Sequence, residues 1–572
     1  MQTLILILTA AILFPCQTDG NNLISYQKLD NPKLIFETIP DRESPVYQAG
    51  SGVITSSPGD TVGWTYYDYQ CNGSTGQRIV LDEIGGSHVF WVRTGSNLYP
   101  PGIWYNHIDS LGNVLWPYEG IPIVENAGFP QAAADTEDYV GFSYKSTSIL
   151  NNLWYSYFSL QHNIFRSFQT GIDSAFNPYI SIDNNRYPHI VCYKYSPNYE
   201  FPLNLYYMGA TDDGNLWTIH NIDKVESPSA IVTSSPVSRK TAVVFAHPTT
   251  GGYSWRNDVH YVETPDGLNW DWINDRINIT EYGQNNDSLF ACVDLDAVYD
   301  FNDNLHIIWN AHWATDQVIY YKTFLFHYDS QSGIISEVSS SDSVWISGCN
   351  PGAWNRPICK MSIGIQYESN NLYTVYTRFD TSDCSAGGYA NGDLYMQYSL
   401  DGGSSWSAPE NITNSLTPNC VPGDCDSDHW PSMAEHIDDY LHIFYVNDKD
   451  AGGIPQTEGT VTLNPMLYLA YPAVTTGKKD KAELPFTINL LRAYPNPFNA
   501  RATIEFDLAA PCDVELTIYD ITGAKVETIR RPGLKAGRHS ILWDGDGVAS
   551  GVYFARMEAG GYSQSIKMVL LK

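Results

Sequence analysis

The chain has 572 residues, of which 17% are charged and 13% are aromatic, including 40 Tyr and 16 Trp. This length predicts more than one domain, and the aromatic content favours β structure over a helical bundle. The formal net charge of −31 argues against nucleic acid or an anionic membrane surface as a general partner.

The first patterned segment is an apolar run near the N-terminus. Leu4 to Phe14 has the length of the hydrophobic part of an export signal and is too short to span a bilayer. We expect residues 1–20 to be a signal peptide, although no Lys or Arg precedes the run. Pro15 disfavours lipidation at Cys16, and no other segment is long and apolar enough to be transmembrane. The sequence therefore predicts a protein that is secreted or attached to the outer cell surface.

A short run of β-branched and aromatic residues recurs seven times along the chain. Consecutive copies start roughly 50 to 70 residues apart, a spacing typical of propellers and other repeat arrays. A short strand and a polar turn precede each copy, and an aromatic strand and a Gly/Asp turn follow it, so each repeat predicts four antiparallel strands. The copies are 87–93, 139–145, 187–194, 241–247, 305–311, 372–378 and 441–447.

These repeats predict an all-β fold, with a seven-bladed β-propeller over residues 49–473 after a polar lead-in at 21–48. A strand at Val62–Gln70 precedes the first full repeat. We expect it to supply the outer strand of the last blade, because closing a ring with strands from both termini removes an exposed edge. A long β-helix or several sandwiches are the alternatives, but their repeats are shorter or less regular.

One turn between predicted strands carries the motif SxDxGxxW, made by Ser399, Asp401, Gly403 and Trp406, and residues 210–217 hold a degenerate copy. In this motif Asp bonds turn amides, Gly takes a positive φ and Trp fixes the hairpin against the blade. The chain thus resembles the sialidase-like propellers, whose Asp-box it matches. In that family the motif lies at the end opposite to the active site, so the resemblance implies a structural role.

The C-terminal part has a different pattern. Residues 474–486 form a polar, Lys-rich linker, and residues 487–572 alternate apolar and polar residues between Gly and Asp turns, which predicts an Ig-like β-sandwich. Ala493–Asn499 (AYPNPFN) and the ending Lys567–Lys572 (KMVLLK) resemble the type A C-terminal sorting domain of the type IX secretion system. A flagellar-hook-capping Ig-like module is a related pattern. The resemblance implies export by the type IX machinery, commonly followed by removal of the tail and attachment to surface lipopolysaccharide.

Nine cysteines remain after the predicted signal. In an exported chain, Cys349/Cys359 and Cys420/Cys425 are predicted to close loops as disulfides. Cys192 and Cys292 lie inside apolar strands and are predicted to be buried thiols. The odd count leaves a free thiol or an intermolecular bridge, and the lack of CxxC pairs argues against zinc.

Basic residues recur where the seven apolar strands end. When the strands are aligned on the histidines at their starts, five of the seven carry Lys, Arg or His five positions later. Because the second strand of every blade ends at the same face, we predict a ring of positive groups at one axial mouth, suited to carboxylates or sulfates. Pairing with Asp or Glu of neighbouring blades is the alternative role. The proposed ligand-binding residues are Arg93, Lys145, Lys194, His247, His312 and Arg378.

Other residues of the repeats allow further assignments. The aligned histidines His88, His189, His306 and His442 start the strands, and we assign them packing and hydrogen bonding rather than catalysis. At the other end, loop aromatic and histidine side chains either stack on sugar rings or plug the axial channel. These are Tyr99, Tyr253, Trp255, His312 and Trp313.

An acidic loop suggests the one cofactor that we consider, Ca²⁺. Asp424, Asp426 and Asp428 alternate as calcium ligands do, and Asp448 and Asp450 should lie beside them in the seventh blade. A solvated acidic loop is the alternative interpretation.

A sialidase needs three arginines on the substrate carboxylate, a Tyr activated by Glu, and an Asp acid. No Arg-Ile-Pro occurs near the first blade, and Arg93, Arg256 and Arg378 are the only arginines that we place near the mouth. The leading hypothesis is therefore a secreted propeller that binds a glycan or another anionic extracellular ligand without evident catalysis. The alternatives are a sialidase-like glycoside hydrolase or a lyase at the same mouth, and a non-catalytic structural or adhesive surface protein.

Overall fold

The computed structural model describes residues 4–6, 23–25, 36–38, 56–474 and 489–572, apart from short gaps. The gaps are 71–75, 83–84, 97, 99, 111, 135–138, 148–151, 161–163, 195–201, 211–215, 250–255, 283–288, 315–318, 342–347, 368, 495, 497, 509–511, 535–536, 546 and 560–561. Most of the predicted signal peptide and most of the degenerate Asp-box copy lie outside the described residues, as do Cys71, Tyr99, Tyr253 and Trp255. The chain divides into two compact units, Met1–Thr475 and Thr476–Lys572.

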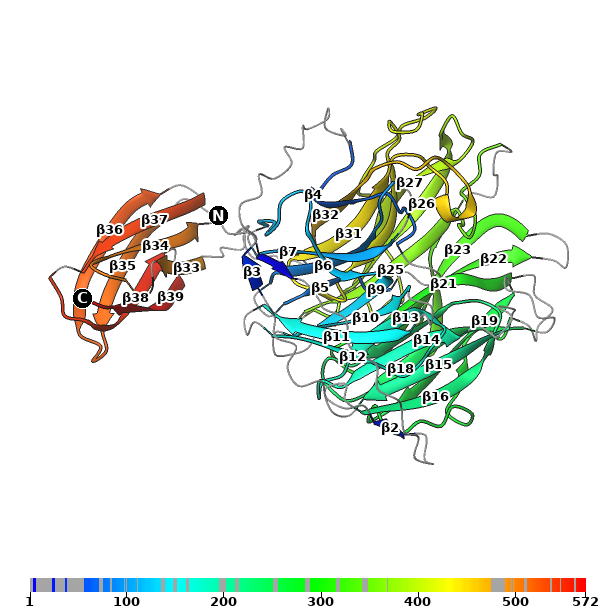
Figure 1. Ribbon diagram of the computed structural model, residues 1–572, viewed down its shortest axis with the longest axis horizontal. Coiled ribbons are helices and arrows are strands. Elements are labelled where there is room, and N and C mark those ends of the chain that lie inside the picture. The colour runs from blue at the N-terminus through cyan, green and yellow to red at the C-terminus, as the bar shows by residue number, and fades with distance from the viewer. Residues whose placement is uncertain are drawn as a thin grey trace. The chain divides into compact units, whose positions relative to one another are not determined.

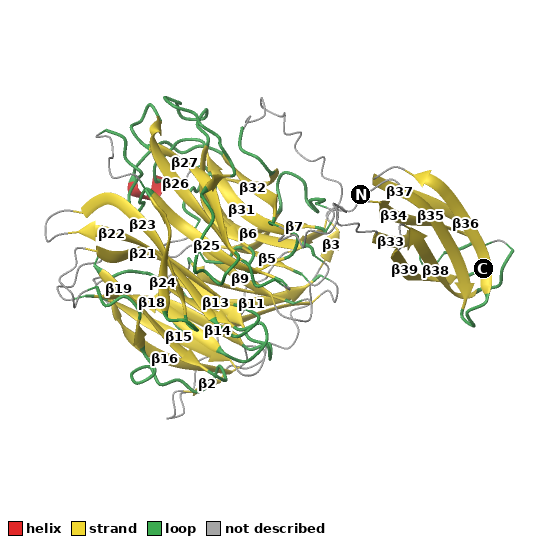
Figure 2. Cartoon of the chain, turned by 180° about the vertical axis from the view of Figure 1, so that it is seen from behind, coloured by secondary structure: helices red, strands yellow, loops and turns green. Residues whose placement is uncertain are grey.

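The larger unit can be divided into groups of four antiparallel strands that follow one another along the chain (Figures 1 and 2). The fourth and fifth groups are joined into one eight-stranded sheet by a single residue pair, Asn257 with Ala291. Group 1 contains β5 (Ile79–Leu81), β6 (Ser87–Arg93), β7 (Gly102–Ile108) and β8 (Ile121–Glu125), and group 2 contains β9 (Ala127–Ala134), β10 (Val140–Ser146), β11 (Leu153–Ser159) and β12 (Ile164–Gln169). Group 3 contains β13 (Ala175–Ile182), β14 (Pro188–Lys194), β15 (Leu203–Ala210) and β16 (Leu216–Val225), and group 4 contains β17 (Ala230–Ser234), β18 (Thr241–Pro248), β19 (Asn257–Thr264) and β20 (Ile277–Asn278).

Group 5 contains β21 (Leu289–Tyr299), β22 (Leu305–Ala314), β23 (Ile319–Asp329) and β24 (Ile334–Ser340), and group 6 contains β25 (Ile358–Gln366), β26 (Leu372–Cys384), β27 (Ala390–Ser399) and β28 (Glu410–Asn411). Group 7 contains β29 (Ser427–Met433), β31 (Tyr440–Asp448), β32 (Asn464–Pro472) and β4 (Asp60–Thr65). Four short strands complete the unit: β1 (Leu4–Leu6), β2 (Leu23–Ser25), β3 (Phe36–Thr38) and β30 (His436–Ile437). Among the described residues the only helical element is η1 (Ile454–Gln456).

The last group is completed by a strand from the start of the unit. β4 pairs antiparallel with β32, in a register that sets Thr65 opposite Asn464 and Asp60 opposite Tyr468. The structure thus confirms that the strand ahead of the first repeat supplies the outer strand of the last one. The benefit is physical, because this pairing covers backbone groups that would otherwise form an open edge.

The first strands of successive groups also pack beside each other. Lys360 N donates to Asp294 Oδ2 at 3.3 Å between groups 5 and 6, and Met433 N donates to Ser362 Oγ at 3.2 Å between groups 6 and 7. From group 7 back to the start of group 1, Arg78 N donates to Ser432 Oγ at 2.8 Å. The inner strands therefore follow one another in a closed circuit.

The second strand of each group is covered on both faces. Val89, Phe90 and Trp91 are consecutive in β6, and all three are fully buried. Successive side chains of a strand point to opposite faces, so this burial requires packing on both sides. It explains why these strands are apolar at every position rather than at alternate ones.

The smaller unit has two antiparallel sheets around one core. Its strands are β33 (Asn489–Tyr494), β34 (Arg501–Leu508) and β37 (Gly537–Asp544) in one sheet, and β36 (Lys525–Leu534), β35 (Cys512–Asp520), β38 (Gly551–Ala559) and β39 (Tyr562–Leu570) in the other. Ile504, Leu516, Trp543 and Met568 belong to the shared core. β38 alternates buried and exposed residues, as expected for a strand with one face on the core.

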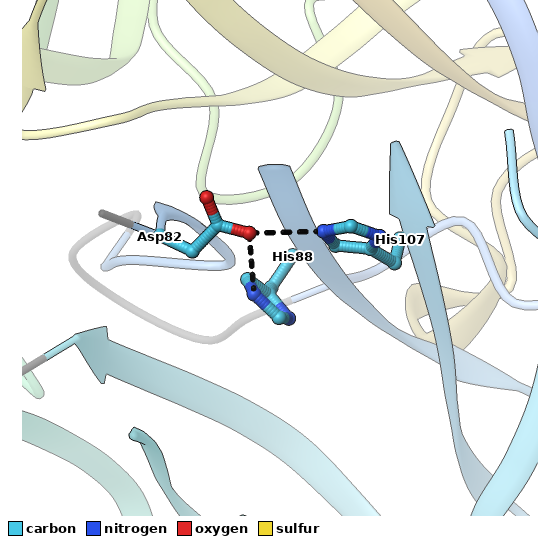
Figure 3. A group of neighbouring side chains, drawn as sticks. All are labelled: Asp82, His88 and His107. Atoms are coloured by element: carbon cyan, nitrogen blue, oxygen red, sulfur yellow. Dashed lines mark hydrogen bonds and ion pairs between the residues drawn. The ribbon is translucent and has the colours of Figure 1, made fainter. Parts of the chain in front are cut away.

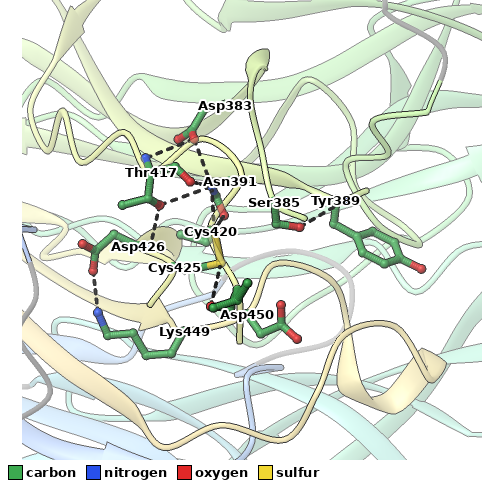
Figure 4. The surroundings of a disulfide bond; sticks show 12 residues. Asp383, Ser385, Tyr389, Asn391, Thr417, Cys420, Cys425, Asp426, Lys449 and Asp450 are labelled. Carbon is green, nitrogen blue, oxygen red and sulfur yellow. Dashed lines mark hydrogen bonds and ion pairs between the residues drawn. A yellow bond between two sulfur atoms is a disulfide. The ribbon is translucent and has the colours of Figure 1, made fainter. Parts of the chain in front are cut away.

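The disulfides differ in part from the prediction. Cys420 pairs with Cys425 as expected (Figure 4), whereas Cys349 pairs with Cys384, so the predicted Cys349/Cys359 bridge is wrong. The isolated bridge between Asn350 and Tyr389 holds the two segments together and brings the Cα atoms of Cys349 and Cys384 to 5.9 Å. A third free thiol, Cys359, is buried in β25, and Cys192 and Cys292 are buried free thiols as predicted.

Candidate functional site

Two of the predicted ligand-binding residues are arginines stacked on aromatic rings. The guanidinium carbon of Arg93, at the end of β6, lies 4.0 Å from the ring centroid of Trp104. That of Arg378, in β26, lies 5.3 Å from the ring centroid of Tyr395. Both arginines are half-buried. Each ring therefore stabilises the cation and fixes the plane of its N–H donors.

The other four predicted residues differ in burial and partners. Lys194 forms a surface ion pair with Asp173, and His247 Nε2 lies 3.4 Å from Asp223 Oδ2. Burial lowers the pKa of the Lys145 amine. His312 is buried within β22. Five of the six residues lie within two residues of the end of a second strand, whereas Arg378 lies in the middle of β26. Together they do not make one uniform positive surface.

The same end of group 5 carries an exposed aromatic cluster, which we call the aromatic hairpin. It consists of Trp313, Tyr320 and Tyr321, where β22 ends and β23 begins, with 42%, 48% and 39% of their surfaces exposed. The Trp313 ring makes an edge contact with Phe324 at 5.2 Å between centroids. Exposed aromatic side chains at a strand end offer flat apolar surface to a ligand.

Two cations also lie beside the aromatic hairpin. The Lys322 amine lies 5.2 Å from the Phe324 ring centroid. The guanidinium carbon of Arg356 lies 5.6 Å from the Tyr321 ring centroid, and Arg356 donates to the Tyr320 carbonyl. The hairpin therefore combines stacking surface with positive charge in a unit that is acidic overall.

Beneath this end lies a buried polar centre that sequence reasoning missed. Lys360 Nζ donates to Asp294 Oδ1 at 2.9 Å and lies 4.5 Å from the Trp430 ring centroid, and both members of the pair are buried. Arg78 donates to the Trp430 carbonyl and is fully buried. Burial, together with the charges of Lys360 and Arg78, holds the pKa of His429 well below its usual value.

A signal for this centre was present in the sequence. Lys360 lies in β25, flanked by Cys359 and Met361, and Arg78 directly precedes Ile79 of β5. A lone cation inside an apolar strand is rarely buried unless it is paired. The position of Lys360 is also unusual in its backbone, with a φ of 54° at a bulge of β25.

The acidic loop proposed for Ca²⁺ is held mainly by protein groups. Asp426 pairs with Lys449 at 2.6 Å (Figure 4), whereas Asp428 accepts from Asn447 at 2.9 Å and from Ser415 at 2.8 Å. Burial raises the pKa of Asp428 to about 7.

Of the remaining acidic side chains, Asp424 is exposed, Asp448 is buried, and Asp450 accepts from the Thr460 amide at 2.6 Å. Among the described residues, the one group of three side chains close enough to hold a metal lies elsewhere. Calcium at the acidic loop stays a prediction from residue spacing.

The aligned histidines occupy a repeated hydrogen-bonding arrangement at the opposite end of the groups. Nδ1 of His88, His189 and His442 lies 2.6–2.7 Å from a Tyr hydroxyl on the third strand of its group. Nε2 of the same ring lies 3.1–3.5 Å from an Asp carboxylate in the preceding turn. The Tyr residues are Tyr105, Tyr207 and Tyr468, and the Asp residues are Asp82, Asp183 and Asp438. We call this arrangement the Asp–His–Tyr triad. In group 5, His306 uses His327 and Asp300 instead.

The Asp-box turn has the hydrogen bonds expected of a structural turn. Gly403 N donates to Ser399 Oγ at 2.8 Å, and Asp401 Oδ1 accepts from Ser405 N at 2.9 Å. Gly403 has a φ of 87°, and a Cβ there would lie 1.9 Å from the His327 ring, so only Gly fits. Trp406 Nε1 donates to Ser336 Oγ of group 5 at 3.3 Å. The turn fastens two groups together, and the sialidase-like resemblance that it carries stays a prediction.

Comparison with known proteins assigns the C-terminal unit. Residues 492–571 match the family model of the secretion system C-terminal sorting domain. The protein is therefore of the class that carries a type IX sorting domain, and it is secreted or displayed at the outer cell surface. No helix among the described residues has the length and apolar character needed to cross a membrane. No curated protein gives a significant match.

Several solved structures are similar to the chain at low identity. Polysaccharide lyase Uly1 is 10% identical over 73% of this chain and 98% of that chain, with a TM-score of 0.43. A PL25 ulvan lyase bound to -[GlcA(1-4)Rha3S]- is 10% identical over 72% and 96%, with a TM-score of 0.44. An alpha-L-arabinanase of Penicillium chrysogenum is 8% identical over 60% and 93%, with a TM-score of 0.36. Structural similarity at such low sequence identity and TM-score does not assign an activity to this chain.

Proposed function

We propose that the protein is a surface-delivered seven-bladed β-propeller with a C-terminal Ig-like sandwich, and that its propeller binds an anionic extracellular glycan without catalysing a reaction. Each strand group of the larger unit is then one blade, which agrees with the closed circuit of inner strands. The sorting domain brings the propeller to the cell exterior, where such glycans occur.

The observation that carries the proposal is the aromatic hairpin with its cations. Trp313 and Tyr320 are both more than 40% exposed, and Lys322 shares their part of the hairpin. Aromatic rings stack on the apolar faces of sugars, and a cation beside them attracts a carboxylate or sulfate. In an otherwise strongly acidic unit, a positive site of this kind favours an anionic sugar over a neutral one.

The test is binding of the full-length secreted chain to an array of uronate-containing, sulfated and neutral glycans, followed by calorimetry on the best ligand. Trp313→Ala/Tyr320→Ala should weaken binding at least tenfold. Lys322→Ala should weaken binding mainly at low salt, because screening reduces the contribution of an exposed charge. Tyr440→Ala is the matched control, since Tyr440 is 47% exposed at the start of β31, at the opposite end of its strand group. Unchanged binding by the double variant, or no binding of any anionic glycan, contradicts the proposal.

A glycoside hydrolase or lyase is the second candidate, favoured by two buried carboxyl groups. Burial raises the pKa of Asp68 and of Asp448, each of which is at most 5% exposed. A carboxylic acid that keeps its proton near neutral pH can serve as a general acid. Incubation with the glycans that bind should then release reducing or unsaturated ends, and Asp448→Asn should abolish that release. If the protein neither binds these glycans nor releases reducing or unsaturated ends from them, a structural or adhesive role is the remaining hypothesis.

A further inference from the structure

A second site lies at the opposite end of group 1, within the Asp–His–Tyr triad (Figure 3). Asp82 Oδ2 is 3.1 Å from His107 Nε2 and 3.5 Å from His88 Nε2. One potential metal-binding atom from each of the three side chains lies within 4.8 Å of the others. The side chains are 4–12% exposed, so the cluster lies just below the surface.

Comparison among the groups shows which residues of this cluster belong to the repeated Asp–His–Tyr triad and which do not. The triad itself recurs in groups 3 and 7. The residue that pairs with the triad histidine across the hairpin is His107 in group 1, but Gly209 in group 3 and Ala470 in group 7. A second imidazole is therefore not needed to build a group, and His107 is an addition to the repeat.

The geometry of the three side chains suits a tetrahedral metal ion. Zn²⁺ binds His nitrogen and Asp oxygen at about 2.0–2.2 Å, which places neighbouring ligand atoms about 3.3–3.5 Å apart. The separations of the two imidazole Nε2 atoms from Asp82 Oδ2, 3.5 and 3.1 Å, lie close to that spacing. All three ligand atoms lie within 4.8 Å of one another, and the centroids of the two imidazole rings are 4.6 Å apart.

The surroundings of the cluster also resemble those of metal ligands. His88 Nδ1 is 2.7 Å from the Tyr105 hydroxyl, which orients Nε2 toward Asp82. Gly86 N donates to Asp82 Oδ1 at 2.7 Å and leaves Oδ2 facing the imidazoles. A Cβ at position 86 would lie 2.5 Å from Asp82 Oδ2 and 2.6 Å from His107 Nε2, so Gly86 keeps this space open. Such supporting hydrogen bonds fix the tautomer and direction of metal-binding side chains.

We propose that Asp82, His88 and His107 bind one Zn²⁺ ion, with a water molecule as the fourth ligand. Two neutral imidazoles and one carboxylate form a donor set that Zn²⁺ accepts and that Ca²⁺, which prefers oxygen ligands only, does not. The lack of CxxC pairs does not bear on this ligand set, which contains no cysteine. The site lies away from the aromatic hairpin, so the proposal is independent of glycan binding.

The test is calorimetric titration of the full-length chain, first stripped with a chelator, with ZnCl₂. We expect one site of micromolar or tighter affinity, and visible absorption of tetrahedral Co²⁺ when CoCl₂ replaces ZnCl₂. His107→Ala and His107→Gln should weaken Zn²⁺ binding at least tenfold and remove the Co²⁺ bands. His220→Ala is the matched control, because His220 is a half-buried histidine of another group, and it should leave both signals unchanged.

A gain-of-site variant makes the test independent of folding defects in group 1. Ala470 is exposed and pairs with His442, so Ala470→His adds the second imidazole to the triad of group 7. We expect the Zn²⁺ stoichiometry to rise from one to two. The proposal is overturned if the wild-type chain binds no Zn²⁺, or if both His107 variants retain the affinity and the Co²⁺ spectrum of the wild type.

Discussion

The two ends of the strand groups are built on different principles. Where second strands begin, groups 1, 3 and 7 repeat one hydrogen-bonded triad of Asp, His and Tyr. Where second strands end, the residues change from group to group: Arg93 stacks on Trp104, Lys194 pairs with Asp173, and His312 is buried. A feature that supports the folding of the repeats can recur from group to group, whereas a feature that serves one ligand needs to occur only once. The comparison assigns folding mainly to the first end and recognition mainly to the second.

The strongest challenge to that division is the Lys360–Asp294 ion pair, because it is buried at the variable end and should matter for folding rather than for recognition. Lys360→Ala removes the cation that faces the buried Asp294 side chain, so we expect a loss of about 3–5 kcal/mol in the free energy of unfolding, measured by chemical denaturation. Lys360→Met combined with Asp294→Asn should recover most of this loss. A cost below about 1 kcal/mol for Lys360→Ala would show that water reaches the pair.

A second buried group at this end, Asp428, should make stability depend on pH. Because the pKa of Asp428 is raised to about 7, the folded chain keeps a proton between pH about 4 and 7 that the unfolded chain has released. The stabilisation from this group is complete below pH about 4 and is lost as the pH rises through 7, by up to about 4 kcal/mol. Asp428→Asn should therefore gain stability relative to the wild type between pH 5 and pH 8 in thermal unfolding. A constant difference across this range would contradict the assignment.

At the repeated end, the triads should contribute comparable amounts of stability. His189→Ala removes a buried partner from both Tyr207 and Asp183, so we expect a loss of about 1–3 kcal/mol in the free energy of unfolding. His442→Ala should cost a similar amount, and the double variant should show additive losses because the groups are separate. In metal-free protein, His107→Ala should cost less than either, since groups 3 and 7 are built without this residue. A larger cost for His107→Ala would make it part of the fold.

The smallest effect on stability is expected for the stacked arginines at the variable end. Arg93→Ala and Arg378→Ala should each change the free energy of unfolding by about 0.5 kcal/mol or less, because both side chains are half-buried. If these arginines contact the ligand, the double variant should nevertheless have a lower affinity for an anionic glycan than the wild type, as measured by calorimetry. Glycan binding that survives the double substitution would confine recognition to the aromatic hairpin.

The sequence predicted those parts of the fold that depend on local patterns. The recurring apolar strands and the sorting motif at Ala493–Asn499 are visible in short windows, and the pairing of β4 with β32 follows from the need to cover an edge. The partner of Cys349 was not predictable in this way. The choice of Cys384 over Cys359 depends on two segments that only the folded chain brings together.

The candidate sites were predicted less completely than the fold. Trp313 was recognised from its position in a loop, but Tyr320 and the cations Lys322 and Arg356 join it only through the hairpin geometry. His107 pairs with His88 across a hairpin, and one sequence does not show which residue of the third strand will stand there. The sequence therefore indicated which residue types belong to the sites. Which of these residues lie next to each other depends on the strand register, which only the structure gives.

The pairing of β4 with β32 has a consequence for survival outside the cell. If a protease cuts one surface loop, the strands on each side of the cut stay paired and packed against their neighbours, because β4 and β32 close the circuit of groups. At least two cuts are needed to release a fragment. During synthesis, residues 60–65 are made long before residues 464–468, so the last group is completed only when nearly all of the larger unit has been made. Truncated chains lack this strand pairing and should be degraded as unfolded protein.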